Sequence, residues 1–236
     1  GQLVELTEEL LKVSVDHESL IKSQALQKIR QFFKEKESVF GPIGFFIINP
    51  NSISIGSKRD SNLGTFNYIA KQKPEVIKNV FKGIPGLIPP IRSDVFLTDS
   101  ERTNQDKLPA TMFFSAPIQK KNGQIIAVFT QRIDPTKEFS KILQYARINE
   151  TDDIYAFDEK GVLLTASRFE KQLKQAEILE PDQSSILNIE IKDPGGNLIT
   201  GYKPTVQVSA MPYTLMAQSV LEMRKQNGHS SRYDEV

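Results

Sequence analysis

The N-terminal segment, residues 3–36, repeats its hydrophobic positions with the period of a helix. Its apolar residues recur three, four or seven positions apart, and it contains neither glycine nor proline. This spacing places the apolar side chains on one helix face. We therefore predict one long helix within residues 1–40, which ends where Gly41 and Pro42 break the hydrogen-bond ladder. Three roles fit its apolar face: packing on one domain, spanning two stacked domains, or forming the seam of a dimer.

After residue 43 the pattern changes to short apolar runs that are separated by turn residues. Residues 44–48 and 52–55 flank an Asn-Pro-Asn turn and predict a first hairpin. Residues 112–118 and 125–133 flank Asn122-Gly123, a dipeptide that is typical of a tight hairpin turn. Strands that are joined by hairpins are antiparallel, so the predicted fold class is α+β rather than a parallel α/β sheet.

Helix and break signals separate the two hairpins and follow the second one. Residues 74–82 begin with proline and are followed by glycine, which is typical of a short helix. Residues 84–90 hold three prolines, and we expect them to be irregular. Asp134-Pro135 has the form of an N-cap followed by a proline in the first turn, and it predicts a helix that runs to Arg147.

The first hairpin recurs later in the chain with an offset of 109 residues. In both copies two apolar runs flank a turn, and an arginine follows the second run. A unit repeated in phase indicates two related modules, and the alternative is a coincidental likeness of two hairpins. The matched pairs are Phe45 and Ile154, Asn49 and Asp158, Ile53 and Val162, and Arg59 and Arg168.

Composition narrows the chemistry that the chain can carry out. Its 39% hydrophobic and 25% charged residues are ordinary for a globular protein, and a net charge of +1 gives no basic excess for nucleic-acid binding. Cysteine is absent, and the only histidines are His17 and His229. Disulfides, thiol catalysis, cysteine-ligated metals and a Ser-His-Asp hydrolase are therefore not expected. We assign no catalytic residue, no metal site and no cofactor from the sequence.

Several segments together resemble the double Cache family of PAS-like sensor domains. They are the long N-terminal helix, the strand FFSAPI, the Asn-Gly hairpin, the following RIDPTKEFSKIL and the later DDIYAFDEKGVLLTASRF, so the likeness covers residues 3–180. The resemblance implies the extracytoplasmic ligand-sensing domain of a bacterial signal-transduction receptor rather than an enzyme. The output domain of such a receptor is a histidine kinase, a cyclase, a chemoreceptor or a Ser/Thr kinase.

The same resemblance implies how the chain is organised. The long helix over residues 1–40 would precede a membrane-distal Cache module over 41–148, which holds the ligand pocket, and a membrane-proximal module over 149–236. Membrane spans are expected outside this fragment, which would then be periplasmic or extracellular. The expected partners are a small-molecule ligand and a second copy, held weakly through the N-terminal helix. The alternatives are a ligand-free dimerisation module and a small-molecule enzyme.

The second module is expected to be incomplete. The chain reaches Val236 without a closing apolar hairpin like the one that residues 112–133 supply in the first module. The second sheet should therefore leave an edge unpaired, which is a liability unless it is covered. Residues 203–236 should pack loosely or lean on a neighbouring chain.

Candidate ligand-binding residues are polar, charged or aromatic residues within or beside apolar segments. In the amino-acid-binding branch of the family, an Arg followed by Trp-Tyr lies over the pocket and an Asp reads the amine. This chain has Phe66-Asn67-Tyr68 and Arg132 in those places and no tryptophan. Because arginine binds carboxylates through two parallel hydrogen bonds, we expect a small organic anion such as a carboxylate. The candidates are Arg59, Tyr68, Arg92, Ser93, Asp94, Phe114, Ser115 and Arg132.

Each candidate also has a structural interpretation. Arg92 and Asp94 would pair in a loop, Ser115 would accommodate the proline that follows it two positions later, and Arg132 would turn outward by strand alternation. Arg59 has a counterpart in the second copy of the hairpin, which favours a structural role for it.

Overall fold

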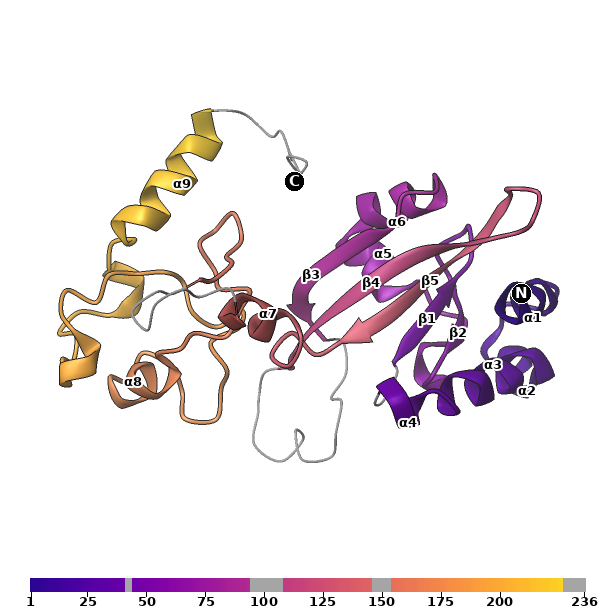
Figure 1. Ribbon diagram of the computed structural model, residues 1–236, viewed down its shortest axis with the longest axis horizontal. Helices are drawn as coiled ribbons and strands as arrows, with labels where there is room; N and C mark the ends of the chain where they lie inside the picture. Colours follow the sequence, from indigo (N-terminus) through magenta and orange to yellow (C-terminus); the bar gives the residue numbers. More distant parts are fainter. Residues whose placement is uncertain (41–43, 94–107, 146–153, 227–236) are drawn as a thin grey trace. The chain divides into compact units, whose positions relative to one another are not determined.

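The computed structural model describes residues 1–40, 44–93, 108–145 and 154–226, which fall into two compact units (Figure 1). The first unit takes in the described residues up to 93 together with 111–134, and the second takes in the others. The N-terminal helices therefore belong to the same unit as the first sheet. The main part of the second unit begins at Pro135, earlier than the module boundary expected near residue 149.

The first unit is built on a five-stranded antiparallel sheet with helices on its faces, so the fold is α+β (Figure 1). The strand order is β2-β1-β5-β4-β3, and both predicted hairpins are present, β1 with β2 and β4 with β5. Gly123 has a φ of +88°, the left-handed conformation that the Asn-Gly turn requires. The strands are β1 (Phe45–Ile48), β2 (Ser54–Ser57), β3 (Gly86–Arg92), β4 (Ala110–Gln119) and β5 (Ile125–Ile133).

The N-terminal segment forms four helices, so the prediction of one long helix is wrong. Asp16 caps the second of them by accepting a hydrogen bond of 2.9 Å from the backbone N–H of Ser19, and Ser23 is extended before the third. Polar residues of this kind start a new helix without any glycine or proline, and periodicity alone does not reveal them. The helices are α1 (Gln2–Leu10), α2 (His17–Lys22), α3 (Gln24–Lys34) and α4 (Glu37–Phe40).

The four short helices bury their apolar stripe within the first unit. α1 packs on α3, and Leu10, Leu20 and Ile29 have no exposed surface and share one core with Ile47 of β1. Fully burying an aliphatic side chain contributes about 1.5–3 kcal/mol to the free energy of folding, and this favours folding the segment back onto the sheet. The side chains that were expected to be available to a dimer seam therefore pack inside the unit.

The other face of the sheet packs against α5 (Tyr68–Gln72) and α6 (Pro74–Phe81). Asn67 caps α5, because its Oδ1 atom accepts hydrogen bonds from the backbone N–H groups of the second and third residues that follow. Phe113 of β4 and Val128 of β5 share a core with Ile77 and Val80 of α6. This arrangement decides which side chains of β4 and β5 lie beneath helices α5 and α6.

The proline-rich stretch that we expected to be irregular is largely a strand. β3 includes both Pro89 and Pro90 and lies at the edge of the sheet. Proline lacks an N–H donor, and an edge strand tolerates one whose nitrogen faces the side without a neighbour. Since the nitrogens of successive residues face opposite sides, this accounts for one of the two adjacent prolines.

The second unit is mostly helix and turn. Residues 154–226 contain no extended strand, and the strands expected there reduce to isolated bridges between Phe157 and Leu163, Val162 and Glu190, and Lys192 and Tyr213. Its described helices are α7 (Phe139–Tyr145), α8 (Glu170–Gln175), η3 (Leu198–Thr200), η4 (Val208–Ala210) and α9 (Leu215–Gln226).

The helix that we predicted to begin at Asp134-Pro135 begins later. A turn precedes α7, in which the backbone N–H and the hydroxyl of Ser140 both donate to the carbonyl oxygen of Pro135, at 2.9 and 3.0 Å. The predicted end of this helix, Arg147, lies outside the described residues.

The repeated hairpin has the same turn in both units. Asn49 accepts hydrogen bonds through Oδ1 from the backbone N–H groups of Asn51 and Ile53, at 3.0 and 2.9 Å. Asp158 does the same with the residues two and four positions further on, both at 2.9 Å. The short carboxamide or carboxylate side chain thus holds the same Asx turn in each copy.

A short backbone pairing also follows this turn in both copies. Ser54 exchanges backbone hydrogen bonds with residues 64–65, and Leu163, which is 109 positions later, exchanges them with residues 187–189. Gly64 and Leu187 both have positive φ, +72° and +61°. The repeat detected in the sequence therefore coincides with a local likeness of backbone structure.

Candidate functional site

A line of polar side chains crosses the face of the sheet beneath α5 and α6. Ser115 lies opposite Thr130 across β4 and β5, and Phe113 lies opposite Arg132. Directly opposed residues of antiparallel strands share a face, and Phe113 fixes which face this is because it packs with α6. Alternation along β4 places Thr111 on the same face. We call Thr111, Ser115, Thr130 and Arg132 the polar line.

Two hydroxyl groups of the polar line are buried without a hydrogen-bond partner in the described part of the chain. Thr111 and Thr130 are 2% and 0% exposed, and the Oγ1 atom of each is unpaired. Ser115 differs, because its hydroxyl donates to the carbonyl oxygen of Gly86 at 2.8 Å. A buried unpaired hydroxyl costs about 1–3 kcal/mol, so natural proteins rarely keep one without a use.

Arg132 belongs to the face of the sheet that α5 and α6 cover, because it lies opposite Phe113. Its backbone N–H donates to the carbonyl oxygen of Gly44 at 2.7 Å, which continues the ladder beyond β1. A Cβ atom at Gly44 would lie 3.2 Å from the Cβ atom of Arg132. The glycine therefore leaves room for the arginine side chain to pass.

Tyr68, Arg92 and Ser93 come together at the edge of the same face. The Tyr68 hydroxyl donates to the backbone carbonyl of Arg92 at 2.6 Å, and Ser93 is buried. Partial burial lowers the pKa of the Arg92 guanidinium from its ordinary value, but the group stays charged. In Figure 1 β3 runs in the direction of β5 and against β4, so Arg92 lies at the same end of the sheet as Arg132.

Three candidates from the sequence are not part of this group. Arg59 follows β2, which is the opposite edge strand from β3. Phe114 alternates to the other face of β4, where its side chain is 57% exposed. Asp94 lies outside the described residues.

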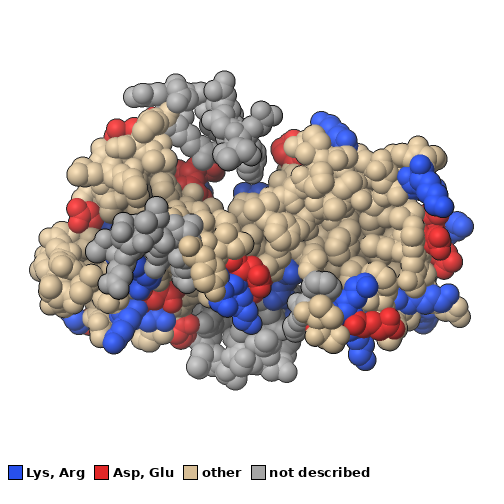
Figure 2. All heavy atoms as spheres, in the orientation of Figure 1, with Lys and Arg blue, Asp and Glu red and all other residues tan. Residues whose placement is uncertain are grey.

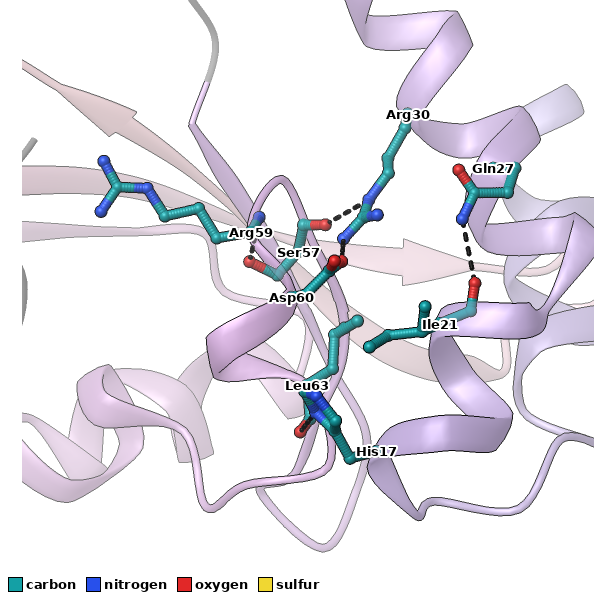
Figure 3. A network of polar contacts seen from close by, with 8 residues as sticks. All are labelled: His17, Ile21, Gln27, Arg30, Ser57, Arg59, Asp60 and Leu63. Carbon is teal, nitrogen blue, oxygen red and sulfur yellow. Dashed lines mark hydrogen bonds and ion pairs between the residues drawn. The ribbon is translucent and has the colours of Figure 1, made fainter. Parts of the chain in front are cut away.

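The surroundings of Arg59 serve the structure of the first unit. Arg30 of α3 donates from Nε to the carbonyl oxygen of Ser57 at 2.9 Å, and from Nη2 to Oδ1 of Asp60 at 2.7 Å. The backbone N–H of Arg59 donates to the Ser57 hydroxyl at 3.1 Å, while its guanidinium extends away from this network (Figure 3). His17 Nδ1 lies 3.1 Å from the carbonyl oxygen of Leu63 and ties α2 to the same region.

Thr111 and Thr130 are the members of the polar line that were not recognised in the sequence. The signal was nevertheless present, because a two-residue Asn-Gly turn fixes the register of its strands. Counting outward from Asn122-Gly123 pairs Ser115 with Thr130. The structure has the same pair, although its loop is longer than two residues and a register shift between Ile118 and Gln119 compensates. Threonine in a strand carries no chemical signal by itself, since it is common in sheets.

Figure 2 shows basic and acidic side chains interspersed around the visible surface of each unit. The described residues hold no group of three histidine, aspartate or glutamate side chains that could bind a metal ion. In the same part of the chain, no helix has both the length and the apolar character of a membrane span.

Comparison with known proteins finds likeness only at the level of structure. No family model and no curated protein sequence matches the chain. The ligand-binding domain of the Campylobacter jejuni chemoreceptor Tlp3 in complex with 4-methylisoleucine has a TM-score of 0.42 at 16% identity, over 76% of this chain and 64% of that one. The Tlp3 domain in complex with L-valine has a TM-score of 0.39 at 17% identity, over 76% of this chain and 65% of that one.

A further similar structure is the periplasmic sensory domain of the Campylobacter jejuni chemoreceptor Tlp1. Its TM-score is 0.37 at 15% identity, over 82% of this chain and 66% of that one. The present chain thus matches just under two thirds of the length of these receptor domains. At TM-scores below 0.5 these likenesses carry no argument about ligand or activity, which must come from the site itself.

Proposed function

We propose that this chain is the ligand-sensing domain of a bacterial membrane receptor, and that its first unit binds a small organic anion on the polar line. The observation that carries the proposal is the pair of buried, unpartnered hydroxyls, Thr111 and Thr130, beside Arg132. A ligand that accepts hydrogen bonds would satisfy these donors, which the protein itself leaves unpaired.

The charges of the site favour an anion over an amine. Arg132 and Arg92 both lie at one end of this face. A guanidinium meets a carboxylate with two parallel, charge-assisted hydrogen bonds, which orient as well as attract it. The hydrogen bond from the Tyr68 hydroxyl to the Arg92 carbonyl oxygen would hold the end of β3 in place.

Signalling follows if the ligand prefers one arrangement of the domain. Binding beneath α5 and α6 would favour the form in which these helices lie closest to the sheet, and the change would pass through the second unit to the membrane. A ligand shifts such an equilibrium only through its difference in affinity for the two forms. Equal affinity for forms locked by engineered crosslinks would rule out this relay.

A thermal-shift screen tests the ligand class. The full chain is heated with small organic acids, amino acids, amines and nucleobases in turn. A carboxylate at one hundred times its Kd should stabilise the first unit by about 2.7 kcal/mol, which raises Tm by roughly 10 °C for a unit of this size.

Two arginine variants assign the effect to the site. Arg132→Gln should abolish the rise in Tm, whereas Arg59→Gln, which changes an arginine at the opposite edge of the sheet, should retain it. Stabilisation by amines or amino acids but not by simple acids would contradict the arginine argument. If no compound shifts Tm, the domain is the ligand-free dimerisation module instead.

A further inference from the structure

The second unit contains a cavity of about 310 Å³, which lies among residues 155–214. Elements from most of this unit contribute to it, including α8, η3 and the segment that leads to α9. Its lining is chiefly aliphatic and aromatic. The aliphatic side chains include Leu163, Leu173, Ile178, Ile189, Ile191 and Met211.

The cavity is partly open to solvent and has room for a small molecule. Liquid water occupies about 30 Å³ per molecule, so the cavity is about ten waters in size, at the lower end of the range for small-molecule sites. Its mainly apolar walls offer water few hydrogen-bond partners, so an apolar molecule that displaces this water removes apolar surface from solvent and is favoured.

The charges in the lining are balanced. Glu190 and Lys192 are its charged residues among those described, and they pair with each other at 3.2 Å. The Lys192 ammonium also lies 3.7 Å from the centroid of the Tyr213 ring, so a second interaction holds it. A charged ligand would lose its water without finding an unbalanced opposite charge, which disfavours it.

Three polar side chains give the cavity a directional preference. Ser167, Asn197 and Thr214 line it, and the oxygen of each accepts a hydrogen bond from a backbone N–H a few residues downstream. Because these oxygens act as acceptors, the hydroxyl and amide hydrogens remain able to donate. A ligand that supplies an acceptor, such as a carbonyl oxygen, suits this set.

We infer that the second unit binds an uncharged, mainly apolar small molecule that carries a carbonyl group. This site is separate from the polar line of the first unit, and its ligand class is different. The domain then has two inputs, an anion on the first unit and an apolar molecule in the second.

The test uses prodan, a neutral naphthalene ketone whose emission shifts to the blue in apolar surroundings. Titration into the full chain should give a saturable blue shift. The competitors 2-acetylnaphthalene and 2-naphthoate share one ring system and differ in whether they carry a ketone or a charge. The ketone should displace prodan at a concentration at least tenfold lower than the carboxylate.

Variants locate the binding. Leu198→Trp puts an indole into the cavity wall and should weaken prodan at least tenfold. Val206→Trp adds the same group at a position that is 54% exposed and outside the lining, and it should leave binding unchanged. If Leu198→Trp alters the circular dichroism spectrum, Ile178→Trp replaces it as the deciding variant.

Two results would overturn the inference. One is a prodan signal that Leu198→Trp leaves unchanged but that Met216→Gln or Met223→Gln removes. Both methionines are exposed on α9, so this result would mean that prodan adsorbs to the surface of that helix. The other is equal displacement by the ketone and the carboxylate. Neither result bears on the anion screen of the first unit, so the two proposals stand or fall separately.

Discussion

Replacing the Thr130 hydroxyl by a methyl group should stabilise the protein, although most core substitutions destabilise. Thr130→Val conserves the shape of the side chain and removes a hydroxyl that is 0% exposed and has no partner. Burying an unpaired hydroxyl costs about 1–3 kcal/mol in proteins, so we expect the free energy of unfolding to rise by about 1–2 kcal/mol. The same variant should bind the anion of the first unit more weakly.

Thr7 provides the matched control. It is also 0% exposed and belongs to the first unit, but its hydroxyl donates to the carbonyl oxygen of Leu3 at 2.7 Å. Thr7→Val therefore loses a hydrogen bond with a net worth of about 1 kcal/mol, and stability should fall. The two substitutions are chemically identical and have opposite predicted signs.

Urea unfolding, with amide hydrogen exchange of β5 to report on the first unit alone, measures both variants. The difference between them should be about 2–3 kcal/mol, which corresponds to roughly 10 °C in Tm. If Thr130→Val destabilises as much as Thr7→Val, the Thr130 hydroxyl has a partner after all. The argument for a ligand at the polar line would then lose its main support.

Two further predictions concern backbone features of the first unit. The backbone N–H of Ser19, with smaller contributions from nearby hydroxyls, lowers the pKa of the Asp16 carboxyl from 3.8 to about 2. The stabilisation by this charge is present above pH 3.8 and is lost as the pH falls towards 2. In acid unfolding, the difference in stability between the natural chain and Asp16→Asn should therefore vanish near pH 2. A difference in stability that does not change with pH would contradict this. Gly64→Ala should lower Tm clearly more than Gly123→Ala in thermal unfolding. Both glycines have positive φ, but only at Gly64 would a Cβ atom meet backbone, 2.6 Å from the carbonyl oxygen of Val15. Equal losses of stability would show that the contact relaxes.

The repeated Asx turn suggests how far the likeness of the two units extends. Asn49 and Asp158 fix the same local hydrogen bonds, yet only the first copy continues into a full sheet. In the first unit β5 supplies the neighbour of β1, whereas within residues 154–226 no strand takes that place. Local sequence therefore sets the turn, and the partner strand decides whether a sheet grows from it.

The candidate site was partly readable from the sequence. Ser115 and Arg132 were identified as polar residues within apolar strands, and the register of the Asn-Gly hairpin would have added Thr130. The repeat favoured a structural role for Arg59, but the sequence did not show that Arg59 and Arg92 lie far apart, because residues 84–90 were not expected to form a strand. The strand order shows that Arg59 and Arg92 are far apart, because β2 and β3 lie at opposite edges of the sheet.

The sequence by itself determined the features that depend on neighbouring residues. These are the two hairpins, the glycine turn at 123, the helix at 74–81 and the repeat at an offset of 109, all of which follow from periodicity and turn chemistry.

Tertiary structure alone decided the features that depend on distant partners. The N-terminal stripe breaks into four helices because capping residues let it fold back and bury Leu10, Leu20 and Ile29 on the sheet, a gain that a continuous helix cannot reach. Residues 86–92 form a strand despite Pro89 and Pro90, because at the edge of the sheet one side of the strand needs no hydrogen-bond donors. The burial of the unpaired hydroxyls and the cavity of the second unit both arise from packing between residues that are distant in the sequence.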